Sequence, residues 1–282
     1  MGLHRLQLRI WKDRGFKAIV ILFSFLSIVP LLLILFYIIK NGILSIGWEF
    51  FVELPRPVGE KGGGISNAIV GSLLLVIIAG LPSIPLGIAA GIYLSENKKS
   101  TITYWSGLAV DVLQGTPSIV IGIIAYLWVV VPMGGFSAFA GGIALGIMML
   151  PMIVKATEET LSLIPGSLKE ASLALGVPYY RTILRVILPA GVSGIMTGVL
   201  ISTARVAGET APLLFTAFGN AFMNWNPTNP VHSLPLLIYN YATSPYPEWH
   251  QVAWGASCVL VVFVLTLNLV MRTVIRRWKV QF

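Results

Sequence analysis

Charged residues are scarce in this chain: Asp, Glu, Lys and Arg make up 11% of its 282 residues, whereas hydrophobic residues make up 56%. Soluble domains carry about 25% charged residues, because their surfaces face water. A composition so poor in charge, with a mean hydropathy of +0.85, therefore excludes an ordinary soluble protein. It indicates an integral membrane protein, and the length of the apolar runs makes helices the expected spanning elements.

Two further absences narrow the possible functions. The chain has one cysteine, Cys258, so no disulfide framework can form within it, and its place in an apolar run predicts a small buried side chain. The glycines at 62–64 are not followed by the Lys-Ser/Thr of a phosphate-cradling loop, and no other nucleotide-binding motif is present. We therefore expect no cofactor bound directly by this chain and no enzyme activity of its own.

What the chain does contain is a set of six apolar runs, each long enough to cross about 30 Å of hydrocarbon as a helix. Pro132, Gly134 and Gly135 mark the turn that divides the longest uncharged stretch into two spans. We predict one all-α transmembrane domain over 1–282, with spans at approximately 18–39, 66–94, 107–131, 136–154, 187–217 and 253–272.

Lys and Arg are distributed unequally between the two sides that six spans define. The side with both termini carries fifteen of the nineteen Lys and Arg residues, whereas the opposite side carries Lys40, Arg56 and Lys61. Because positively charged segments stay in the cytoplasm, both termini are predicted to be cytoplasmic, in a multi-pass protein of the cytoplasmic (inner) membrane. The net charge of +8 then reflects membrane topology and not nucleic-acid binding.

Two patterns predict how segments pack. The outer segment 220–250 is polar and Pro-rich but also holds Leu and aromatic residues, so we expect a re-entrant or interfacial helix near 235–241. Glycines four residues apart let helix backbones approach closely in lipid, and we expect them to serve packing within this chain. The pairs are Gly87 with Gly91, Gly142 with Gly146, and Gly194 with Gly198.

The stretch between the fourth and fifth spans predicts a folded hairpin of two short helices. Ser167 and Glu170 have the spacing of a capping box that starts the first helix, and Gly176 is suited to a left-handed stop. Pro178 suits the first turn of the second helix, which we expect to end at Pro189. Glu170 either caps its own helix or is presented to a soluble partner, and the residues alone leave both open.

This hairpin resembles the cytoplasmic loop motif of ABC-importer permeases, E-A-(small)-x3-G-x9-(aliphatic)-x-L-P. The resemblance implies the type I importer permease fold, in which the loop, here approximately 155–186, forms a coupling helix that docks on a separate ATPase subunit. The matching positions are Glu170, Ala171, Ser172, Gly176, Val186, Leu188 and Pro189, with Ser172 in place of the usual Ala.

Arg205 and Glu209 are the only Asp, Glu, Lys or Arg residues between 186 and 248. Their four-residue spacing places them on one helix face, where they can pair, and Pro212 predicts a kink near Gly208. The pair is either a structural link between helices or part of an anion path. Arg suits oxyanions because its planar fork makes bidentate hydrogen bonds to them.

The stretch ARVAGETAPLL, which contains this pair, resembles the PstA-type permease subunits of phosphate importers, with PstC-type subunits second. GGGISNAIVGSLLL, PLGIAAGIYLSE, LQGTPSIVIG and SLPLLIYNYA agree with it. The resemblance implies phosphate as cargo, with another oxyanion or small solute as the alternative. It implies as partners a PstC-type second permease, two copies of an ATPase subunit that uses ATP and Mg²⁺, and an extracytoplasmic phosphate-binding protein, all in or beside membrane lipid.

Other functions are weaker hypotheses. GASC at 255–258 would make Ser257 the nucleophile of an intramembrane hydrolase, but this requires a hydrogen bond to His232 or His250 as its base. A secondary transporter would not need the cytoplasmic hairpin. Asp111, near the start of the third span, is expected to be a helix N-terminal charge or to face a partner.

Overall fold

The fold is all-α in the part of the chain that the computed structural model describes, residues 2–60 and 62–277, with one isolated bridge between Phe218 and Val231. Lys61 and Lys279, which were counted in the charge bias, lie outside the described residues. The long helices are α1 (Gly2–Gly42), α3 (Ser66–Glu96), α7 (Ala138–Ser162), α10 (Leu188–Ala207) and α13 (Pro247–Arg277).

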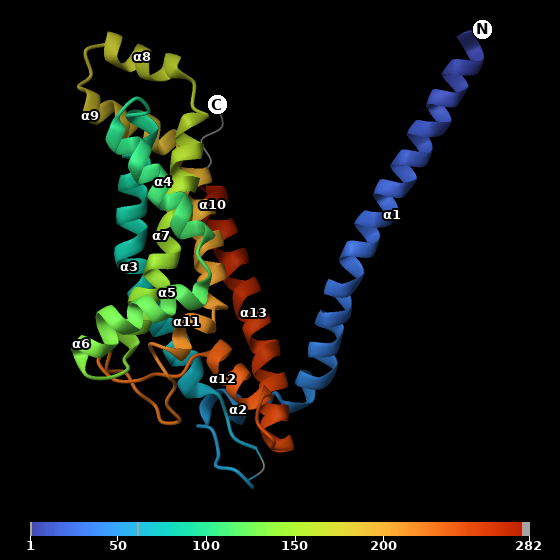
Figure 1. Ribbon diagram of the computed structural model, residues 1–282, viewed down its shortest axis with the longest axis vertical. Coiled ribbons are helices and arrows are strands. Elements are labelled where there is room, and N and C mark those ends of the chain that lie inside the picture. The colour runs from blue at the N-terminus through green and yellow to red at the C-terminus, as the bar shows by residue number, and fades with distance from the viewer. Residues whose placement is uncertain (1, 61, 278–282) are drawn as a thin grey trace.

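The shorter elements connect these helices and cover their ends (Figure 1). They are η1 (Ile43–Ser45), α2 (Trp48–Val52), α4 (Thr101–Gly115), α5 (Ser118–Ala125), η2 (Tyr126–Val130), α6 (Val131–Met133), α8 (Gly166–Ala174), α9 (Tyr179–Thr182), η3 (Ile183–Ile187), α11 (Ala211–Leu214) and α12 (Leu234–Ala242).

Five helices in the described residues are long and apolar enough to cross a membrane, and the number is six if one bent pair of helices counts as a single span. The bent pair is Thr101–Gly115 with Ser118–Met133, which meet at 105°, where we predicted one continuous span over 107–131. Pro117 explains the break, because the residue before a proline is driven out of the helical region and Thr116 is extended, with φ −73° and ψ 132°. The chain is therefore a multi-pass membrane protein whose third span is broken near its middle.

Helix α7 is the centre of the bundle, with α3 and α10 packed along it. A methyl group at Gly91 would lie 2.5 Å from Thr157 Cβ, and one at Gly198 would lie 2.1 Å from Ala156 Cβ. These contacts leave no room for a side chain, so the predicted use of glycine for close packing within the chain is confirmed for these helices. The surrounding core includes Leu75, Ala79, Leu145, Met149, Ile153, Val199 and Leu213.

Helix α1 stands apart from the bundle and contacts it near one end only, where the rings of Tyr37 and Trp254 pack edge to face (Figure 1). Most of its apolar side chains are exposed. It begins, and α13 ends, toward the end of the molecule at which α8 stands (Figure 1). Cys258 packs beside Gly42 at the junction of α1 and α13 and is half-buried, not buried as predicted.

The outer segment contains the helix that its sequence predicts, α12. Leu234, Leu236 and Leu237 are buried, and the backbone N–H of Leu234 donates to Ser72 Oγ of α3 at 2.8 Å. The hydroxyl of Ser233 accepts from Leu236 N–H and so caps the helix. The segment is thus packed onto the bundle, and its position relative to a lipid surface stays a prediction.

Candidate docking hairpin and charged pocket

The first arm of the hairpin, α8, begins without the predicted capping box. Pro165, with φ −57° and ψ 131°, is the last extended residue, and no side chain caps the helix. Ser167 cannot act as the cap because its backbone already lies inside the helix. Within the described residues Glu170 has no hydrogen-bond or ion-pair partner, and it is exposed. The structure therefore removes the self-capping interpretation of Glu170.

The turn between the two arms has the glycine geometry that the sequence predicts. Gly176 has φ +77°, and no atom lies within 4 Å of where its Cβ would be, so backbone conformation and not space requires glycine here. Its N–H donates to the carbonyl of Leu173 at 2.9 Å. Pro178 is the extended residue that precedes α9, one position before the predicted first turn.

The two arms are joined by a buried hydrogen bond that the motif does not contain. Ser172 Oγ lies 2.9 Å from Thr182 Oγ1, and both residues are buried. The alanine usual at this position could not make this bond. Ser172 therefore does more than replace one small residue with another: it holds α8 against α9.

A second attachment of the hairpin comes from the end of α3. The carboxylate of Glu96 accepts hydrogen bonds from Lys169 Nζ and from Tyr179 Oη, and these two donors lie 3.3 Å apart. The hydrogen bond to Glu96 raises the pKa of Lys169 above its ordinary value, against partial burial, which lowers it. Sequence reasoning missed this cluster because its members are 73 and 83 residues from Glu96 and no local pattern links them.

The second arm does not end at Pro189 as predicted. One helix runs from Tyr179 to Ala207, and the five residues before Leu188, Ile183–Ile187, form a π-helical turn. Pro189 has no N–H and would clash with the carbonyl four residues earlier, and the wider π turn accommodates both effects. Val186 and Leu188 pack at the edge of the core there. The hairpin is therefore continuous with the helix that carries Arg205.

Several large apolar side chains at the hairpin are exposed. Leu163 and Leu175 are each 84% exposed, and Tyr180 is 60% exposed. They lie at and beside α8 and α9, at the extreme end of the molecule (Figure 1). Large apolar side chains that are exposed together at such an end are typical of an interaction surface.

Arg205 lies in the last turn of α10, where it is held loosely. Its Nε is 3.6 Å from Glu209 Oε1, and its Nη1 is 3.6 Å from Met152 Sδ on α7. The side chain of Arg205 is 48% exposed, and that of Glu209 is 18% exposed. The predicted ion pair is present, and the guanidinium keeps most of its donors free for another acceptor.

We predicted that Pro212 would kink the helix near Gly208, and this prediction is wrong, because the helix ends before Pro212. Ala207 is the last residue of α10, Gly208 follows as its C-cap, and a separate short helix, α11, begins at Ala211. Pro212 is buried, and its Cα would lie 2.7 Å from a methyl group at Gly122 of α5. The proline thus starts α11 and packs it against the broken third span.

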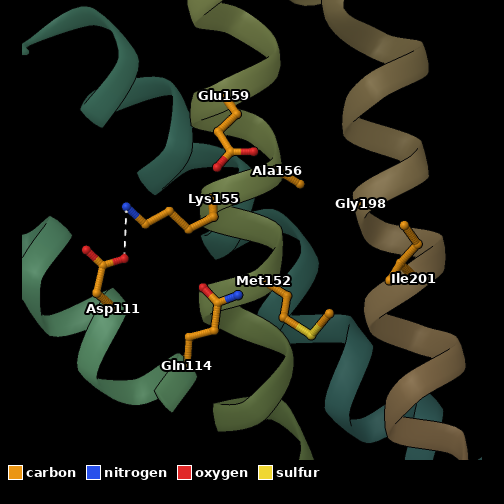
Figure 2. A pocket seen from close by; sticks show the side chains of 8 residues that line it. All are labelled: Asp111, Gln114, Met152, Lys155, Ala156, Glu159, Gly198 and Ile201. Atoms are coloured by element: carbon orange, nitrogen blue, oxygen red, sulfur yellow. Dashed lines mark ion pairs between the residues drawn. The ribbon is translucent and has the colours of Figure 1, made fainter. Parts of the chain in front are cut away.

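A charged pocket of about 340 Å³ lies among α4, α7 and α10 (Figure 2). Lys155 Nζ pairs with Asp111 Oδ1 at 3.0 Å and lies 3.6 Å from Glu158 Oε2. Met152 lines the pocket and also contacts Arg205, so the two charged sites adjoin. The remaining lining residues are Gln114, Ala156, Glu159, Gly198 and Ile201.

This pocket corrects two predictions. Lys155, which we assigned to the cytoplasmic loop, lies within α7, seven residues before the helix ends at Ser162. Asp111 is not a helix N-terminal charge, because it lies in the last part of α4 and its partner is on another helix. Lys155 and Asp111 are 44 positions apart, so no local sequence pattern could predict their contact.

The hydrolase hypothesis finds no support in the geometry. Ser257 Oγ donates to the carbonyl of Ala253 at 2.7 Å, and His250 Nε2 lies 2.7 Å from the carbonyl of Ser244. His232 is buried, and its Nδ1 accepts from the N–H of Ser233. Within the described residues no histidine is hydrogen-bonded to Ser257, and no three His, Cys, Asp or Glu side chains are placed to hold a metal ion.

Comparison with known proteins identifies the family. Residues 83–280 match the family described as "Binding-protein-dependent transport system inner membrane component". The "Phosphate transport system permease protein PstA" of Yersinia pestis is 43% identical over 88% of this chain and 85% of its own length. The "Probable phosphate transport system permease protein PstA" of Methanocaldococcus jannaschii is 39% identical over 92% of each chain.

Solved structures share the fold. The MetNI methionine ABC transporter in an inward-facing conformation matches 77% of this chain and 96% of its own, with a TM-score of 0.66 and 18% identity. A bacterial ABC transporter involved in the import of the acidic polysaccharide alginate matches 95% and 99%, with a TM-score of 0.68 and 16% identity. The chain therefore belongs to the family of binding-protein-dependent transport system inner membrane components and, within it, to the PstA-type permeases.

Proposed function

We propose that this chain is the permease subunit of an ATP-driven importer of inorganic phosphate and forms one half of the translocation path. The observation that carries the proposal is its identity of about 40%, over most of its length, to permeases named for phosphate transport. Two features of the geometry support it: a hairpin with exposed residues, suited to docking an ATPase subunit, and an exposed Arg205, suited to binding an anion.

The hairpin is the docking element for the ATPase subunit. The hydrogen bond between Ser172 and Thr182 fixes α8 to α9, while Glu170, Leu163 and Leu175 are exposed. A short helix with an exposed apolar face fits a groove on a soluble protein. Glu170, Ala171, Ser172 and Gly176 belong to this element, and Val186, Leu188 and Pro189 join it to the membrane helix.

Arg205 is the residue that receives the anion. Its guanidinium offers a planar fork of donors that matches two phosphate oxygens, and its contacts at 3.6 Å can be given up when an anion arrives. Glu209 tempers the attraction, so that the ion can leave as well as enter. Arg205 contacts Met152 near the middle of the 25-residue helix α7, and its side chain is 48% exposed, so an anion could reach it.

The remaining parts belong to partners. A PstC-type permease supplies the other half of the path, two copies of the ATPase subunit hydrolyse ATP with Mg²⁺, and an extracytoplasmic binding protein delivers phosphate. Both termini and the hairpin lie on the cytoplasmic side. Closure of the ATPase pair moves the hairpin, and the helix that continues from it to Arg205 switches the side to which the anion site opens.

The test is uptake of labelled phosphate by vesicles that carry the full complex, with sulfate as competitor. We expect uptake that depends on ATP and on the binding protein and that excess sulfate leaves unchanged. Equal competition by sulfate would favour a general oxyanion importer, since Arg205 alone suits either ion. Absence of ATP-dependent phosphate uptake in an assembled complex would overturn the assignment.

A further inference from the structure

The docking hairpin is attached to the bundle by two routes. One is covalent and runs through η3 into α10, but it passes through a π-helical turn, Ile183–Ile187, whose hydrogen-bond ladder differs from that of the helix on either side. The other is the polar cluster of Glu96, Lys169 and Tyr179, which connects α8 and α9 to α3. The second route has no part in the motif that defines the hairpin.

Glu96 is the centre of this cluster. It is the last residue of α3, its side chain is 13% exposed, and one of its oxygens, Oε2, accepts from both Lys169 and Tyr179. The Lys169 ammonium also lies 4.8 Å from the centre of the Tyr179 ring, within the range of a cation–π interaction. One carboxylate thus binds both arms of the hairpin through charge-assisted hydrogen bonds.

Helix α3 can carry movement from this cluster into the bundle because it is packed closely against α7. At Gly87 and Gly91 a methyl group would lie 2.8 Å and 2.5 Å from side-chain atoms of Ile153 and Thr157, so the two backbones are in near contact. Met152, the neighbour of Ile153, contacts Arg205. A continuous chain of contacts therefore runs from the hairpin through Glu96, α3 and α7 to the anion site.

We propose that Glu96 is a positioning residue for transport, which clamps the docking hairpin to α3 so that movement of the hairpin reaches α7 and Arg205. The clamp couples ATP hydrolysis to movement of phosphate and is not needed for the ATPase to dock. The proposal rests on the proposed function, because it takes the hairpin as the docking element.

The test compares Glu96→Gln and Lys169→Met with Lys99→Met, a control at an exposed lysine just beyond α3, in the full complex. We expect all three to retain the co-purifying ATPase and its hydrolysis rate. The number of phosphate ions moved per ATP should fall by about fivefold in the first two, the effect of losing one charge-assisted hydrogen bond of a partly exposed pair. The control should keep the wild-type ratio.

Charge reversal separates coupling from simple loss of structure. Glu96→Lys and Lys169→Glu should each lower the ratio, and the double variant should restore at least half of it, because the pair is re-formed with the charges exchanged. An unchanged ratio in the single variants would overturn the proposal. So would a parallel loss of ATPase binding that the double variant does not restore.

A spectroscopic measurement tests the clamp without transport. A spin label at Ser167→Cys, on exposed α8, in a Cys258→Ala chain should become more mobile when Glu96→Gln is added to the purified permease. Unchanged mobility would overturn the clamp whatever the cargo is. Failure of the proposed function would instead be seen as absent phosphate uptake in the wild-type complex, with the label still responding to Glu96→Gln.

Discussion

The two ends of the helix from Tyr179 to Ala207 are built in opposite ways. At the hairpin end, polar groups are held by short bonds, as in the buried contact of Ser172 with Thr182 at 2.9 Å. At the other end, Arg205 reaches its partners only at 3.6 Å and is half exposed. The difference separates two tasks. A docking element must transmit force without deforming, whereas a cation on an ion path must exchange one partner for another.

The largest effect is expected at the Arg205 end of this helix. Arg205→Gln should lower phosphate uptake by about two orders of magnitude, because it removes a charged, bidentate partner for the anion. Arg205→Lys, which keeps the charge but loses the fork, should retain intermediate uptake. Initial rates in vesicles measure both, and co-purification of the ATPase shows that assembly is intact. Normal uptake by Arg205→Gln would reduce the ion pair with Glu209 to a structural link.

Acid should affect the segment 220–250, which contains α12, more than the hairpin. Burial lowers the pKa of His232 to about 4 and outweighs a backbone hydrogen bond with Ser233, which raises it. In the unfolded segment the histidine has a pKa near 6.5. As pH falls from about 6.5 to about 4, it is therefore protonated in the unfolded segment but stays neutral in the folded one. The packing of α12 should therefore lose about 3 kcal/mol across that window and be unaffected above it.

Hydrogen exchange of α12 amides at pH 7 and pH 4.5 measures this loss, and His232→Asn is the matched control. Asparagine can accept from the same N–H but does not titrate, so its α12 should respond less to acid. The hairpin should change less between these pH values. Lys169 stays charged throughout, and although burial raises the pKa of Glu96, its hydrogen bonds from Lys169 and Tyr179 hold that pKa below its ordinary value. Equal protection of α12 at both pH values in the parent chain would contradict the assignment.

Gly176 ends α8, and its left-handed backbone conformation makes the hairpin sensitive to backbone strain alone. Gly176→Val should destabilise the hairpin by about 1–2 kcal/mol, because a non-glycine residue is strained at φ +77°. Gly176→Asn should cost less, since asparagine tolerates this region and no atom lies within 4 Å of the Cβ position that both variants add. Co-purification of the ATPase measures docking, and equal retention by both variants would show that the turn does not position the docking element.

The sequence predicted features whose signal is local. The positive φ of Gly176, the pairing of Arg205 with Glu209 and the helix α12 each depend on residues within a few positions of one another. Even local signals failed where proline was involved. The N-cap of α8 is Pro165, two residues before the expected Ser167, and Pro189 lies within a helix because a π turn precedes it. Proline is compatible with several local conformations, and tertiary packing selects among them.

Contacts between distant segments could not be predicted from one sequence. Glu96 gave the appearance of an ordinary charge at the end of a span, and nothing near it points to Lys169 or Tyr179. Lys155 was assigned to a loop because it is the charge that ends a long uncharged stretch, yet it lies within α7 and pairs with Asp111 of another helix. In both cases the stabilising partner becomes a neighbour only when the helices pack.

The smallest effect is expected from the hydroxyl of Ser172, whose hydrogen bond to Thr182 would hold the hairpin rigid. Ser172→Ala restores the residue usual in the motif but leaves Thr182 Oγ1 without this partner in a buried place, so the hairpin should lose about 1 kcal/mol. The double variant Ser172→Ala with Thr182→Val should recover part of that loss, because both polar groups are then removed together. Hydrogen exchange of α8 and α9 amides in the purified permease measures the change. If the single variant were as protected as the parent, the hydroxyl bond would be incidental, and the clamp at Glu96 would be left as the main restraint on the hairpin.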